Sequence, residues 1–184
     1  MFKIMTGQVL LVLCCTVYLI WWYRGFRPGT DVSRVGGVNG LLLLITAALG
    51  LAGVVMSLIS VGEVTGYKIK PEFILFGGIA VYIASLLITR NVFHRIVTTE
   101  LILIVGWTML ELAVSDRLNA AGALPDKCFY AMVIIIAAAF IFSMILYVAY
   151  YRMEEMKAFY AAMLPLVTEG LSMLVLIIML AAAR

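Results

Sequence analysis

Charged residues are scarce in this sequence. They make up 12% of its 184 residues, hydrophobic residues make up 65%, and the mean hydropathy is +1.14. Soluble domains have about 25% charged and about 45–50% apolar residues. The composition excludes a soluble globular protein and predicts a multi-pass protein of the cell membrane, plasma or inner, in which residues 1–184 form a single integral membrane domain.

Histidine and cysteine are also rare. The chain has one histidine, His94, and three cysteines, Cys14, Cys15 and Cys128. Adjacent cysteines on a helix point in different directions, and neither a C-x-x-C pair nor a cluster of histidines accompanies them. We therefore expect no metal site, no redox pair and no cofactor.

Motifs of membrane enzymes are missing as well. The sequence has no D-D-x-x-D, H-E-x-x-H or G-x-S-x-G motif, and its one pair of adjacent glutamates, Glu154 and Glu155, falls in a predicted loop. The protein is more readily read as a non-enzyme, and an intramembrane enzyme acting on lipid is the third of three functional hypotheses. The net charge of +3 comes without a basic patch, which excludes nucleic acid as a partner.

The sequence does contain six apolar runs, separated by charged and turn-forming residues. Each run is near the ~20 residues that a helix needs to cross a hydrocarbon layer of ~30 Å. The runs predict an all-α bundle of six transmembrane helices, at residues 4–23, 38–61, 71–89, 96–114, 128–151 and 158–183. An even number of spans places both termini on the same side of the membrane.

Small and polar residues form a stripe along the second predicted span. Their spacings of 7, 4, 3 and 4 residues place them on one helical face: Asn39, Thr46, Gly50, Gly53 and Ser57. Small residues at such spacing let helix backbones approach closely in membranes. We interpret the stripe as a helix-packing face, with a polar pathway along it as the alternative.

The fourth predicted span carries two carboxylates, Glu100 and Glu111. An acidic side chain within a membrane is costly and is by default a functional hypothesis. The two acids are eleven residues apart, so at about 100° per residue they return to within roughly 20° of each other, with Trp107 on the same stripe. In the alternative interpretation both acids reach out to opposite interfaces, toward Arg95 and Arg117.

The sixth predicted span contains the strongest candidate, Glu169, close to the middle of the run. Pro165 lies one turn before it and cannot donate a backbone hydrogen bond, so we expect a kink there. Ser172 shares the face of Glu169. A carboxylate on an interrupted helix near the midplane is an arrangement that transporters use to bind ions; a structural kink with a hydrogen-bonded glutamate is the alternative.

The fifth predicted span has a single clearly polar residue away from its ends, Ser143, and aromatic residues flank both ends. We expect this span to face lipid.

Together these features favour a small secondary transporter, or the membrane subunit of a transporter, that uses intramembrane carboxylates to bind a proton, a cation or a small solute. A structural or regulatory membrane protein acting through helix contacts is the second hypothesis. The expected partners are the lipid bilayer, a small solute or cation, and either a second copy of the chain or a partner membrane subunit.

Overall fold

The computed structural model describes residues 2–29, 36–94 and 99–182. Within these ranges the chain is entirely helical, with six long α-helices and one short 3-10 helix, η2. The elements are α1 (Phe2–Phe26), α2 (Gly36–Glu63), α3 (Pro71–Phe93), α4 (Thr99–Ala120), α5 (Asp126–Ala149), η2 (Tyr150–Arg152) and α6 (Glu155–Ala182).

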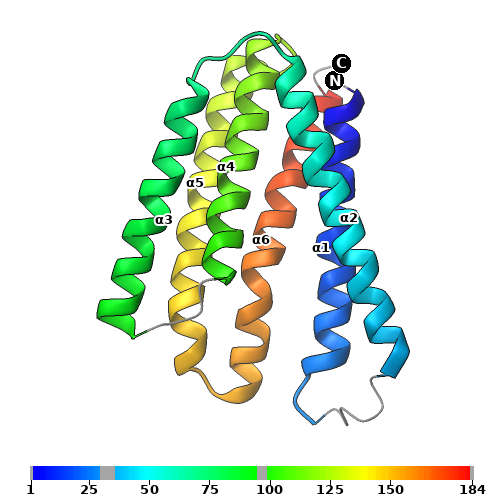
Figure 1. Cartoon of the computed structure of the whole chain (residues 1–184), viewed down its shortest axis with the longest axis vertical. Helices are drawn as coiled ribbons and strands as arrows, with labels where there is room; N and C mark the ends of the chain where they lie inside the picture. The colour runs from blue at the N-terminus through cyan, green and yellow to red at the C-terminus, as the bar shows by residue number, and fades with distance from the viewer. Residues whose placement is uncertain (1, 30–35, 95–98, 183–184) are drawn as a thin grey trace.

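The six long helices run up and down along one long axis, and the two ends of the chain lie at the same end of the bundle (Figure 1). We call this end the terminal end. α2 packs along α1, and α6 packs against both α1 and α5. α4 contacts α2, α3, α5 and α6. The bundle is therefore built around α4 and α6, the helices that carry the three predicted carboxylates.

Five of the helices, all except α4, are long and apolar enough to cross a membrane. α4 has 22 residues, but Glu100, Glu111, Asp116 and Arg117 fall within it. Its buried side chains include Leu101, Ile104, Val114 and Leu118 as well as Glu111 and Asp116. Neighbouring helices thus surround much of the helix that is least suited to contact lipid.

Side chains of α4 hold the connection between α2 and α3 at the terminal end. Asp116 Oδ1 accepts hydrogen bonds from the backbone N–H groups of Lys68 and Ile69, at 3.1 and 2.9 Å. Arg117 donates to the backbone carbonyl of Gly66 at 2.6 Å. Lys68 also pairs with Asp126, and this hydrogen bond raises the pKa of the exposed Lys68. The Arg117 side chain therefore binds the connection between α2 and α3.

The stripe of small and polar residues on α2 lies against α1. A Cβ atom added to Gly53 would lie 2.7 Å from Leu11 Cγ and 3.1 Å from the carbonyl oxygen of Gly7. Cys14 Sγ donates to the carbonyl oxygen of Thr46 at 3.3 Å. Two members lie at the ends of the stripe, where Asn39 approaches Gly25 and Ser57 approaches Gly7. The face is therefore occupied within this chain.

One sequence-based expectation about the helices is wrong. α5 does not simply face lipid: a stripe including Met132, Ile136, Ala139 and Ser143 is buried against its neighbours. Its apolar composition suits both lipid and a protein core, so composition alone could not distinguish them. α6 continues through Pro165 as one α-helix from Glu155 to Ala182; the kink expected at Pro165 stays a prediction.

Candidate functional site

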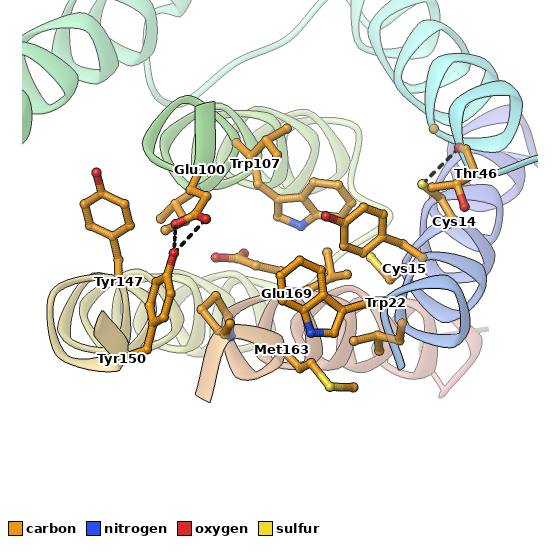
Figure 2. Close-up of a pocket in the computed structure, with 18 of the residues that line it drawn as sticks. Cys14, Cys15, Trp22, Thr46, Glu100, Trp107, Tyr147, Tyr150, Met163 and Glu169 are labelled. Carbon is orange, nitrogen blue, oxygen red and sulfur yellow. Dashed lines mark hydrogen bonds between the residues drawn. The ribbon is translucent and has the colours of Figure 1, made fainter. Parts of the chain in front are cut away.

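A cavity of about 360 Å³ opens between α1, α2, α4, α5 and α6, in the half of the bundle away from the terminal end. Small-molecule sites in proteins have similar volumes, from about 300 Å³ upward. Two carboxylic acids, Glu100 and Glu169, line the cavity. In Figure 2 both carboxyl groups point into the same space, with the rings of Trp22 and Trp107 beside it.

Glu169 projects from α6 at the inner part of the cavity and is only 5% exposed. Ser143 on α5 donates a hydrogen bond to its Oε1 at 3.2 Å. The polar residue that the sequence assigned to a lipid-facing helix is therefore a partner of the principal candidate acid. Pro165 and Leu166 line the cavity one turn earlier on α6.

Glu100 lies in the first turn of α4. Tyr150 of η2 donates its hydroxyl to the Glu100 carboxyl, with distances of 2.8 and 2.9 Å to the two oxygens. The contact is drawn in Figure 2. The other partner proposed for Glu100, Arg95, lies outside the described residues. Glu100 is thus held toward the cavity by a side chain that follows α5.

Glu111 is more deeply buried than Glu169, with 1% of its surface exposed. Ser172 Oγ on α6 lies 2.9 and 2.7 Å from its two carboxyl oxygens. The same Oγ lies 2.8 Å from the backbone carbonyl oxygen of Glu169. The interpretation of Glu111 as an interfacial acid that reaches toward Arg117 is therefore wrong, because Glu111 faces α6 and Arg117 binds the α2–α3 connection.

Aromatic side chains form much of the remaining wall. Five of them line the cavity: Tyr18, Trp22, Trp107, Tyr147 and Tyr150. The Nε1 atoms of Trp22 and Trp107 are buried and lack a partner in good hydrogen-bond geometry among the described residues. Trp107 Nε1 is nevertheless near enough to interact with the Glu111 carboxyl. The indole groups thus give the wall both π-faces and hydrogen-bond donors.

The charge of the cavity wall has one sign. Among the described residues that line it, two are acidic and none is lysine, arginine or histidine. His94, the single histidine, is exposed and ends α3 in a left-handed conformation with φ 54°. The described residues also contain no group of three or more His, Cys, Asp or Glu side chains that could hold a metal ion. The carboxyls therefore face the cavity without a basic partner in its described wall.

The structure places four of the six candidate ligand residues in one cavity wall and the other two, Glu111 and Ser172, in contact with each other outside it. Glu100, Trp107, Pro165 and Glu169 line one cavity, and Ser172 joins Glu111 to the segment that carries Glu169. The helix-packing face contributes Thr46 and Gly50 to the wall. That these residues bind a ligand stays a prediction.

Sequence reasoning missed Ser143 and the aromatic residues Tyr18, Trp22, Tyr147 and Tyr150 as parts of the site. The aromatics lie near helix ends, where they are also expected as membrane-interface anchors. Their spacing on each helix gave no means of separating the two roles. A polar residue in an otherwise apolar run was the one available signal for Ser143.

No protein-family model matches the chain, and no curated protein or solved structure shows significant similarity to it. The chemistry of the cavity is therefore the basis on which a function can be assigned.

Proposed function

We propose that this protein is a six-span membrane transporter, or a transporter's membrane subunit, whose cavity binds an organic cation with an apolar body. The observation that carries the proposal is the cavity wall, in which five aromatic residues surround two carboxylic acids and the described lining holds no basic residue.

The composition of the wall favours a cation over other solutes. An ionised carboxylate in a low-dielectric site is costly unless a positive charge accompanies it, and a bound cation supplies that charge. Aromatic faces attract cations by about 0.5–2 kcal/mol each, more strongly when water is excluded. They also bury the apolar part of a ligand. An anion would meet Glu100 and Glu169 without a compensating charge.

A transport role is supported by where the carboxyls lie. Glu169 is buried on α6 and is held by Ser143 from a neighbouring helix. A carboxyl in this position can exchange a proton for a cation, since either one neutralises it. Such an exchange is the elementary step by which a carrier couples a solute to a proton.

The binding experiment uses purified protein in detergent and two ligands of the same shape. Benzyltrimethylammonium carries a positive charge, and neopentylbenzene is its neutral carbon isostere. We expect calorimetric binding of the cation and about tenfold or greater weakening for the neutral isostere. Because protonation removes the charge of Glu169, cation affinity should fall as the pH is lowered.

The substitution Glu169→Gln keeps the size and hydrogen-bonding capacity of the side chain but removes its charge. It should weaken binding of benzyltrimethylammonium by about tenfold or more, the effect of losing roughly 1.4 kcal/mol. Glu72→Gln is the control, because Glu72 lies on the exposed first turn of α3. Equal affinity for the two ligands, or unchanged affinity and pH response in Glu169→Gln, would contradict the proposal and favour a structural or regulatory role.

A further inference from the structure

Polar side chains from four helices lie at one level of the bundle, beyond the cavity and toward the terminal end. We call this set the polar layer; it comprises Gln8 of α1, Ser57 of α2, Glu111 and Ser115 of α4, and Ser172 of α6. None of the five is more than 2% exposed. None of these five residues lines the cavity.

The two apolar clusters on either side place these residues at the same level. One cluster includes Leu11, Val54, Trp107 and Leu166, and the other includes Ile4, Val61, Val114, Leu118 and Leu176. On three helices the polar residue falls between members of the two clusters: Gln8 between Ile4 and Leu11, Ser57 between Val54 and Val61, and Ser172 between Leu166 and Leu176. On α4, Glu111 falls between Trp107 and Val114, and Ser115 directly follows Val114. The layer is therefore a polar section across an otherwise apolar core.

The layer contains a direct contact between α6 and α4. Ser172 Oγ lies 2.7 Å from a carboxyl oxygen of Glu111. A Cβ atom added to Gly7 would lie 2.6 Å from Ser57 Oγ, so this hydroxyl lies against α1 at the residue that precedes Gln8. Ser115 follows Glu111 by one turn and shares its side of α4, about 40° away.

Four polar atoms of the layer lack a hydrogen-bond partner among the described residues: Gln8 Oε1, Gln8 Nε2, Ser57 Oγ and Ser115 Oγ. Buried polar groups in proteins are nearly always hydrogen-bonded to protein, to water or to an ion. Four such atoms at the level of a buried carboxyl point to a bound polar species rather than to an isolated packing fault.

We propose that the polar layer binds a small monovalent cation, either Na⁺ or a proton carried on internal water. The Glu111 carboxyl supplies the negative charge. Gln8 Oε1 and the serine hydroxyl oxygens are the neutral oxygen ligands that such a cation takes, and Gln8 Nε2 donates to a water molecule that accompanies it.

None of the described groups that interact with the Glu111 carboxyl is basic, so the bound cation is the positive charge that pairs with it. The groups that interact with its carboxyl are Ser172 and Glu169 from α6 and Trp107 from α4, and Glu111 acts electrostatically on the thiol of Cys15 in α1. The buried polar residues described on α2 and α5 are all neutral: Asn39, Thr46, Ser57, Ser60 and Ser143. Through Ser172, which also meets the Glu169 carbonyl, occupancy of the layer can be transmitted to the cavity.

The experiment measures thermal unfolding of the full chain in detergent along two arms. In the first arm Na⁺ replaces Cs⁺ at constant ionic strength and fixed pH. In the second arm the pH is varied from 5 to 8 without Na⁺. Stabilisation that grows with Na⁺ concentration identifies Na⁺ as the ligand, whereas a pH dependence without an Na⁺ effect identifies the proton.

The variants Glu111→Gln and Gln8→Leu decide whether either effect arises in the layer. Glu111→Gln should abolish it, and Gln8→Leu should weaken Na⁺ binding by about tenfold or shift the midpoint of the pH dependence. If either of these variants fails to fold, Ser115→Ala, which is a smaller change, is measured in its place. The proposal would be overturned if these variants respond to Na⁺ and to pH as the unaltered protein does. Benzyltrimethylammonium binding, measured in the same samples, reports separately on the cavity, so failure of one site is distinguishable from failure of the other.

Discussion

At the scale of single residues, Ser172 is the most informative side chain of the site. Its hydroxyl carries one proton, yet it lies within 2.9 Å of both carboxyl oxygens of Glu111 and of the Glu169 carbonyl oxygen. It can donate to an ionised Glu111, or donate to the carbonyl and accept from a protonated Glu111. One serine thus accommodates both protonation states of the acid without moving, which is what a proton-binding site requires.

Tyr150 gives a test at the same scale. Its hydroxyl donates to the Glu100 carboxyl, and hydrogen bonds to charged groups contribute about 1.5–3 kcal/mol. We expect Tyr150→Phe to keep the aromatic wall of the cavity and to lower the free energy of unfolding by about 1–3 kcal/mol. Unfolding with increasing SDS in mixed micelles measures this difference.

Tyr160→Phe is the matched control for that substitution. Tyr160 is half exposed on α6, its ring packs against Phe159, and phenylalanine keeps that ring contact. Its stability should change by less than about 0.5 kcal/mol. A loss as large as that of Tyr150→Phe would show that the hydroxyl of Tyr150 has no special role in holding Glu100.

At the scale of elements, the close approach of α1 and α2 depends on glycine. Because a Cβ on Gly53 would already lie 2.7 Å from Leu11 Cγ, Gly53→Leu forces the two helices apart. We expect a loss of stability in detergent of about 1–3 kcal/mol or more. Leu51→Phe is the control, since Leu51 is 69% exposed and a larger apolar side chain there meets detergent or lipid. Equal losses at the two positions would remove the packing interpretation.

The elements themselves were predictable, and their mutual orientation was not. Apolar runs of membrane length predicted the ends of the six helices to within four residues, except that α4 ends six residues beyond its predicted end. Charges and turn residues end each run. Which face of a helix meets protein is a different matter. Apart from Ser143, the middle of α5 is apolar on every side, so one hydroxyl was the only signal that separated the side facing lipid from the side facing Glu169.

Glu111 and Gln8 show the same limit for the site. The position of Glu111 near one end of its predicted span suggested an interfacial acid, but α4 continues to Ala120 and carries Glu111 inside the bundle. Gln8 is completely buried, but the sequence does not predict it as a site residue, because a single amide in an apolar run forms no pattern with other polar residues. Both errors arise because burial depends on neighbouring helices, and one sequence does not show which helices are neighbours.

At the scale of the whole molecule, α4 decides how the chain crosses the membrane. α4 is long enough for a span, but its four charged residues make it less apolar than a typical membrane-spanning helix. Burial of Glu111 and Asp116 against other helices removes most of that objection, because the cost of a charge in a membrane applies to side chains that meet hydrocarbon. In Figure 1 α4 runs along the same axis as the other five helices, although at the end opposite the terminal end it stops short of theirs. Its 22 residues are still enough for a span, so we expect it to cross.

Cysteine labelling at the two ends of α4 tests this expectation. His94→Cys, at the end of α3 that precedes α4, and Ala121→Cys, just beyond α4, are made in a chain whose three cysteines are replaced by alanine. Both positions are exposed. If α4 crosses the membrane, a membrane-impermeant maleimide added to sealed vesicles labels only one of the two, and the other reacts after the vesicles are opened. Labelling of both positions from the same side would mean that α4 does not span. The chain would then have five spans with its termini on opposite sides, and the cavity between α4 and α6 could not lie within a six-span carrier.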